Sequence, residues 1–103
     1  MDRKQLAIDF AKSLNHEEIE KIILFGSVAR REDNKDSDID ILIITQNIDD
    51  ELSIEDDVAD KVFDTLIETE EYLSVKFVPK KHYEERSNFS FYVNVQKDGV
   101  VIG

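Results

Sequence analysis

Apolar residues along the chain follow two patterns, a helical spacing and short unbroken runs, and these patterns alternate. Apolar positions three or four residues apart predict amphipathic helices at residues 3–14 and about 50–68. The apolar run at residues 21–25 predicts a strand buried on both faces. Residues 38–45, which are β-branched and fully apolar after Asp40, predict a second strand, and residues 72–78 predict a third. Helices that alternate with strands predict a small sheet covered by helices.

Two shorter helices and an ambiguous tail complete this picture. Gly26 ends the first apolar run, and residues 26–31 are predicted to open a short helix. Pro79 suits the start of another short helix that extends through Arg86. Residues 88–103 fit two structures, because their apolar positions alternate as in a strand and also share one face of a helix.

Length and charge limit the classes of function. A chain of 103 residues fits one domain, residues 1–103. Its 24 Asp and Glu residues exceed its 13 Lys and Arg residues, which gives a net charge of −11. Such a surface repels phosphate backbones, so direct nucleic-acid binding is not expected. It suits a basic protein partner or divalent cations instead.

Signals for disulfides, export and membrane insertion are missing from the sequence. There is no cysteine, which excludes disulfides and thiolate metal sites. The charged start of the chain lacks the apolar stretch of a signal peptide, and the apolar runs are far too short to span a bilayer. We therefore expect a cytoplasmic protein that does not contact a membrane.

The turn after the first predicted strand carries residues suited to phosphate binding. Gly26 allows close approach of the backbone, and Ser27 adds a hydroxyl donor at the start of a helix. Arg30 lies about one helical turn beyond Ser27, so its guanidinium can reach the same phosphates. A Gly-Ser pair by itself is most often only a turn.

Two carboxylates stand at the start of the second predicted strand. Asp38 and Asp40 are two positions apart, so their side chains are expected on one side of the strand, roughly 6–7 Å apart, with Ile39 facing the core. Such a pair can bind Mg²⁺ through oxygen ligands. An isolated Asp-x-Asp in an acidic protein is usually a solvated loop. Here, however, the pair opens an apolar strand, where carboxylates cost stability unless they have partners.

The segment Gly26-Ser27-x10-Asp38-Ile39-Asp40, within GSVARREDNKDSDIDILI, resembles the minimal nucleotidyltransferases of the DNA polymerase β-like superfamily, of the MntA-like antitoxin type. The spacing of ten matches that family without gaps. The resemblance implies an α+β fold with a small mixed β-sheet flanked by helices. It implies ATP with Mg²⁺, with Gly26 and Ser27 on the phosphates and Asp38 and Asp40 on the metal. It also favours a helix for residues 88–97.

The chain departs from this family at two places. Many members have glycine after the arginine, whereas this chain has Arg31. Catalytically complete members place a third carboxylate on a later strand, but residues 72–78 contain no Asp or Glu. Without the third ligand, substrate binding is expected to survive while turnover becomes slow or absent.

Two functions follow from these observations. The resemblance implies transfer of AMP from ATP to a hydroxyl, on a HEPN-domain toxin that the transferase neutralises as an antitoxin. The alternative is a catalytically weak or inactive binding module that neutralises its partner by docking. The aromatic residues of the tail add a hypothesis of self-association or docking through residues 89–95.

Overall fold

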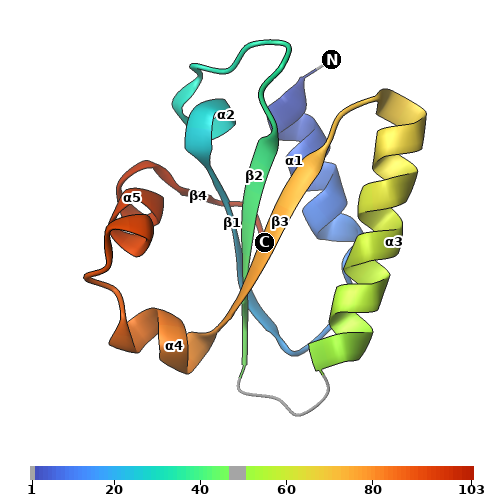
Figure 1. The fold of residues 1–103 in the computed structure, drawn as a ribbon. Helices are drawn as coiled ribbons and strands as arrows, with labels where there is room; N and C mark the ends of the chain where they lie inside the picture. Colours follow the sequence, from blue (N-terminus) through green and yellow to red (C-terminus); the bar gives the residue numbers. More distant parts are fainter. Residues whose placement is uncertain (1, 47–50) are drawn as a thin grey trace.

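A four-stranded mixed β-sheet organises residues 2–46 and 51–103, the parts of the chain that this computed structural model describes (Figure 1). The strands lie in the order β3-β2-β1-β4; β1 runs antiparallel to β2 and β4, and β2 runs parallel to β3. This is the α+β architecture, a mixed sheet flanked by helices, that the resemblance implied. In chain order the elements are α1 (Arg3–Ser13), β1 (Ile19–Phe25), α2 (Gly26–Arg30), β2 (Ile39–Thr45), α3 (Glu51–Thr69), β3 (Leu73–Pro79), α4 (Lys80–Glu85), α5 (Ser90–Asp98) and β4 (Val100–Val101).

The predicted long elements are confirmed, with ends shifted by one or two residues. The first predicted residue of the long helix, residue 50, lies outside the described residues. Strand β2 begins at Ile39, so Asp38 lies just before the strand rather than inside it. The short helix α2 ends at Arg30, one residue earlier than predicted.

The tail and the segment at Pro79 differ most from the sequence pattern. Pro79 is the last residue of β3 and caps α4, so it lies one position before the helix that it was predicted to start. The tail is helical over Ser90–Asp98, as the resemblance implied. It then adds the two-residue strand β4, which pairs with Ile23 and Leu24 of β1 and was not predicted.

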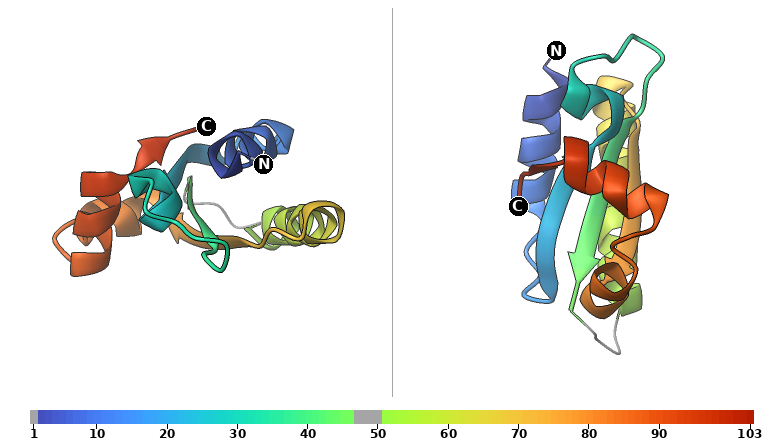
Figure 2. Two further views of the ribbon diagram at one scale, coloured as in Figure 1. Left: turned by 90° about the horizontal axis from the view of Figure 1, so that it is seen from above. Right: turned by 90° about the vertical axis from the view of Figure 1, so that its left-hand side faces the viewer.

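Side chains of β1 and β2 alternate between two covered faces, which is why both strands are apolar throughout their middles. Helices α1 and α3 lie over one face, and α4 and α5 lie over the other (Figure 2). The first face packs Ile22, Leu24, Ile39, Ile41 and Ile43 against Ala7, Phe10, Ile54 and Val58. The second face packs Ile23, Leu42, Ile44 and Val78 against Val95. Among the described helices, none has the length and hydrophobicity required to cross a membrane.

Candidate functional site

Gly26 and Asp40 are brought together by the pairing of β1 with β2. In the antiparallel register Phe25 lies opposite Asp40, and Gly26 follows as the first residue of α2. Gly26 has a φ of +75°, in the left-handed region that side chains avoid. A Cβ added there would lie 2.3 Å from Asp40 Oδ2. Glycine is therefore required both by the backbone turn and by the carboxylate packed against it.

Ser27 and Arg30 follow Gly26 on α2. Ser27 is half-buried in the first turn, and Arg30 is exposed in the last. Arg30 Nε donates a hydrogen bond of 3.0 Å to Glu32, and its guanidinium lies 3.7 Å from Asp98 on α5. The hydrogen bond to Glu32 is the main cause that raises the pKa of Arg30. The guanidinium that was predicted to reach phosphates is thus held by two carboxylates.

Asp38 and Asp40 differ in their surroundings. Asp38 is exposed before β2, whereas Asp40 is half-buried and Ile39 between them is fully buried in the core on the other face. Burial is the main cause that raises the pKa of Asp40, and the charge of Asp38 adds to the rise. The positive charges of Lys76 and Arg30 lower it. The structure therefore places the two predicted carboxylates and the arginine within electrostatic reach of one another.

Strand β3 brings to the face of Asp40 two residues that the sequence pattern did not identify. Ser74 is the register partner of Asp40, and Lys76 is the partner of Leu42. Because alternate residues share a face, Ser74 and Lys76 lie on the same side of the sheet as Asp40. The sequence signal for these two residues is their two-residue spacing in β3. That spacing places them near Asp40 only once the register of β3 with β2 is known.

A family model described as "Polymerase beta, Nucleotidyltransferase" matches residues 8–102, which include every residue of this site. The chain belongs to this nucleotidyltransferase family. No curated protein matches it at a significant level.

Solved structures resemble this nucleotidyltransferase domain at low sequence identity. A toxin–antitoxin structure with AMP-PNP is 16% identical, with a TM-score of 0.54 over 99% of this chain and 72% of that one. A mutant of the toxin–antitoxin MntA-HpeT is 18% identical, with a TM-score of 0.54 over 100% of this chain and 73% of that one. A Sulfolobus solfataricus protein assigned as a nucleotidyltransferase is 22% identical, with a TM-score of 0.48 over 97% and 75% of the two chains.

The donor atoms of this nucleotidyltransferase domain can be compared with what Mg²⁺ requires. Among the described residues, no group of three or more His, Cys, Asp or Glu side chains could hold a metal ion. Mg²⁺ is usually held by one or two carboxylates together with substrate phosphates and water, rather than by a cage of protein ligands alone. Asp38 and Asp40 fit that kind of ion, one that binds together with a nucleotide. The β3 residues Ser74 and Lys76 supply no third carboxylate beside them.

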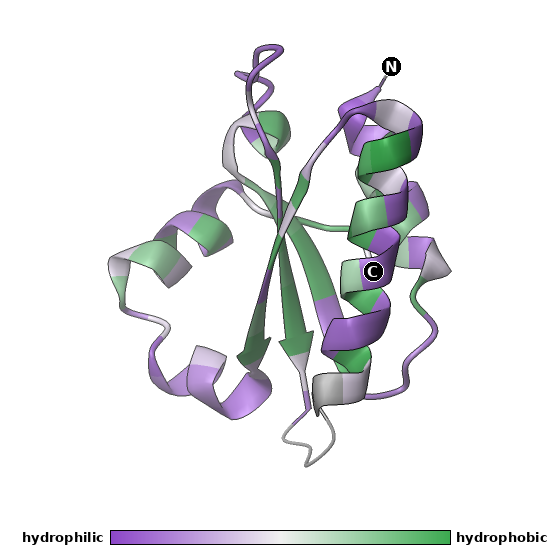
Figure 3. Ribbon diagram, turned by 45° about the vertical axis from the view of Figure 1, so that its right-hand side comes forward, coloured by the Kyte–Doolittle hydropathy of each residue, from purple (hydrophilic) through white to green (hydrophobic). Residues whose placement is uncertain are grey.

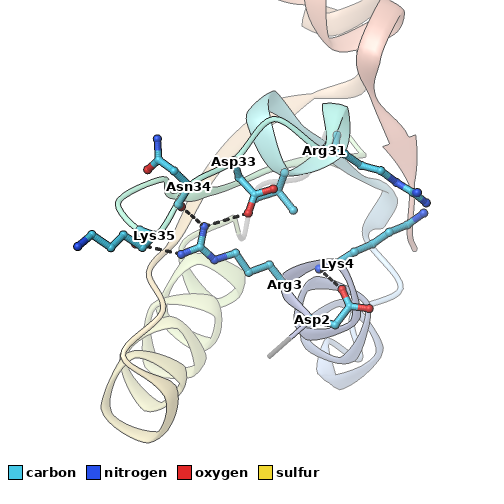
Figure 4. A pocket seen from close by; sticks show the side chains of 9 residues that line it. Asp2, Arg3, Lys4, Arg31, Asp33, Asn34 and Lys35 are labelled. Carbon is cyan, nitrogen blue, oxygen red and sulfur yellow. Dashed lines mark hydrogen bonds and ion pairs between the residues drawn. The ribbon is translucent and has the colours of Figure 1, made fainter.

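A cleft of about 640 Å³ lies between the start of α1 and the loop from α2 to β2, and none of the predicted site residues lines it (Figure 4). Arg3 fixes this loop: it donates to Asp33 at 3.1 Å and to the Lys35 carbonyl at 3.0 Å, and it also donates to the Asn34 carbonyl. It pairs with Glu71 beyond α3 at 2.9 Å. Arg3 thus ties together the segments that lead into β2 and β3, and so helps to position the carboxylates at the start of β2.

Arg31, which lines the same cleft, stands where the family resemblance implied glycine, and its backbone conformation shows what that position requires. It caps α2 with a φ of 60°, in the left-handed region. This position after a helix favours glycine, the residue that the family resemblance implied there. The backbone turn is therefore kept in this chain although the glycine is not.

Proposed function

We propose that the chain binds ATP at the junction of β1, α2 and β2 and transfers AMP to a hydroxyl group of a protein partner. The observation that carries this proposal is the packing of Gly26 against the half-buried carboxylate of Asp40. It sets a backbone turn suited to phosphates beside a carboxylate suited to a divalent ion.

Each residue of the site has a separate role in this proposal. The backbone at Gly26 and Ser27 and the Ser27 hydroxyl donate hydrogen bonds to the β- and γ-phosphates. Arg30 adds a charge-assisted hydrogen bond after exchanging a carboxylate partner for phosphate. Asp38 and Asp40 would hold Mg²⁺, which when bound neutralises the triphosphate and polarises the α-phosphate.

The transfer breaks the phosphoanhydride bond between the α- and β-phosphates and forms a phosphate ester bond to the acceptor. The acceptor oxygen bonds to the α-phosphorus, the bond from that phosphorus to the bridging oxygen breaks, and pyrophosphate leaves. The hydroxyl proton is released to solvent. The chain contributes by holding the triphosphate and aligning its α-phosphate with the acceptor.

The proposed partner is a HEPN-type toxin, with this chain acting as a cytoplasmic antitoxin. Two structures that share the fold are toxin–antitoxin structures, and one of them contains AMP-PNP. A net charge of −11 would attract a basic partner such as a nuclease. Both observations support the proposed partner, and neither depends on the residues of the nucleotide site.

The second candidate function is neutralisation by docking, with little or no nucleotide transfer. Lys76 supports the docking function, because it places a positive charge near Asp40. A third carboxylate on that face of the sheet would instead strengthen metal binding. A site with two carboxylates and a nearby cation binds a metal ion less tightly than a site with three carboxylates.

Two measurements separate these functions. Calorimetric titration of ATP with Mg²⁺ is expected to show binding that is lost in the Asp38→Asn/Asp40→Asn double variant. Transfer of label from [α-³²P]ATP to a co-purified HEPN protein is expected to stop in each single variant. Asp36→Asn, in the exposed loop before the site, is the matched control and should keep both activities.

The outcome for toxicity decides between transfer and docking. If the Asp38→Asn variant still relieves growth inhibition by the co-expressed HEPN protein, docking alone accounts for neutralisation. Labelling that continues at the wild-type rate in both single variants would exclude the proposed site.

A further inference from the structure

An apolar groove runs between α3 and β3, on the face of the sheet opposite Asp40. Its volume is about 290 Å³, and every residue that lines it is apolar or aromatic. The β3 residues Leu73, Val75 and Phe77 face it, whereas Ser74 and Lys76 point to the other side. The groove is therefore separated from the candidate nucleotide site by the sheet itself.

Large hydrophobic side chains are exposed along this groove. Phe63 and Tyr72 line it and are 61% and 49% exposed, and Ile67, one helical turn beyond Phe63, is 67% exposed. Figure 3 shows hydrophobic and hydrophilic residues side by side along the outer side of α3. Clustered apolar side chains of this size indicate a surface that another molecule covers.

A row of carboxylates on α3 begins beside the groove. Asp56, Asp60 and Asp64 are exposed, lie four residues apart on α3, and have no ion-pair partner among the described residues. Asp56 and Asp60 lie three positions before the lining residues Ala59 and Phe63, so by helix geometry they neighbour the groove. Asp64 lies farther round the helix, on the side that faces α1. Like charges four residues apart destabilise a helix, so this row opposes folding of the isolated domain.

We propose that the α3–β3 groove is a docking site for a helix of a partner protein, with an apolar face in the groove and Lys or Arg residues against Asp56 and Asp60. Charge complementarity selects this occupant. A second copy of this chain would bring a net charge of −11 and its own acidic row against the first, which opposes self-association through this face.

The dimensions of the groove suit a helix. Its lining extends along α3 from Val58 to Leu66, which at 1.5 Å per residue is roughly two turns. Helices α1 and α3 already cover this face of the sheet, and β3 is its outer strand (Figures 1 and 2). A partner helix beside α3 would extend that layer, with anchors at helical spacing. Docking there leaves Asp40 accessible, so the proposal does not depend on nucleotide transfer.

The test uses a fluorescein-labelled amphipathic peptide with Leu at i, i+3, i+4 and i+7 and Lys along both flanks, titrated into the full chain. Anisotropy is expected to show binding that weakens with salt, and amide shifts in ¹⁵N-labelled protein should concentrate in α3 and β3. Phe63→Ser and Ile67→Ser should each weaken binding roughly tenfold or more. Both side chains are exposed, so both variants should fold.

The matched control is Phe89→Ser, which removes an aromatic side chain that is 55% exposed outside the groove. It should leave peptide affinity unchanged, and a peptide with Glu in place of Lys should bind much more weakly. Three results would overturn the proposal: equal losses in the Phe63 and Phe89 variants, shifts centred on α5, or a dimer in sedimentation that Phe63→Ser dissociates.

Discussion

Replacing Gly26 by alanine is expected to damage both stability and the candidate site. The variant must hold a Cβ at a φ of +75°, which costs about 1–2 kcal/mol for a residue other than glycine. That Cβ would also lie 2.3 Å from Asp40 Oδ2, about 1 Å closer than carbon and oxygen normally approach. Relief requires the carboxylate to leave its position. We expect a total loss of about 2–4 kcal/mol in the free energy of unfolding.

Urea denaturation followed by circular dichroism measures this loss. For a domain of about 100 residues it corresponds to a fall of roughly 10–25 °C in Tm. Calorimetry should also show loss of ATP–Mg²⁺ binding in the folded variant, because Asp40 is displaced. Ser27→Ala is the control for stability alone, since it removes a hydroxyl from the same turn without adding an atom. The reasoning is refuted if Gly26→Ala unfolds within 0.5 kcal/mol of the wild type, a margin typical of neutral surface changes, and binds ATP with Mg²⁺ equally well.

Further substitutions test other parts of the structure. Arg31→Gly should raise the free energy of unfolding by up to about 1 kcal/mol in urea denaturation, because relief of the left-handed φ of 60° exceeds the added flexibility of the unfolded chain; a loss of stability would show that the arginine side chain stabilises the fold. Asp57 accepts hydrogen bonds from Lys61 and pairs with His16, and these contacts lower its pKa. Its stabilisation should therefore be present above the unfolded pKa near 4 and lost as pH falls through the lower folded pKa. The difference in urea midpoint between wild type and Asp57→Asn should shrink between pH 5 and pH 2.5, and a constant difference would contradict the assignment. Lys76→Asp should raise the affinity for Mn²⁺ by roughly tenfold over the neutral control Lys76→Met in calorimetry, because it adds a carboxylate on the Asp40 face; equal affinities would show that residue 76 does not act on the carboxylate pair.

The long elements could be predicted because their sequence patterns have a single physical cause. Strand β2 is apolar on both faces since helices cover both, and α3 repeats its apolar positions because one side packs on the sheet. Strand β4 could not be predicted from its two residues. It depends on pairing with Ile23 and Leu24, which are distant in sequence. Helix α4 begins one position later than predicted, because Pro79 instead ends β3 at the outer edge of the sheet, where proline is tolerated.

The sequence proposed the residues of the candidate site but not their arrangement. The spacing from Gly26 to Asp40 identified the motif, yet their contact follows from the register of β1 with β2. The position of Lys76 follows from the register of β2 with β3, which no local pattern encodes. The hydrogen bond from Arg30 to Glu32 also depends on how the chain turns after α2. Residue types were therefore readable from the sequence, whereas their electrostatic partners were not.

Charge balance in the site links metal binding to nucleotide binding. Burial raises the pKa of Asp40, and the positive charges of Lys76 and Arg30 offset part of that rise, so two cations already act on the carboxylate pair. A divalent ion that bound alone would be attracted only weakly, because the two cations reduce the negative potential of the carboxylate pair. Its affinity would therefore be low. A triphosphate that entered with the ion would supply the missing negative charge and oxygen ligands. The same two cations that weaken binding of the free ion would then attract the phosphates, so the ion and the nucleotide are expected to bind together rather than one after the other.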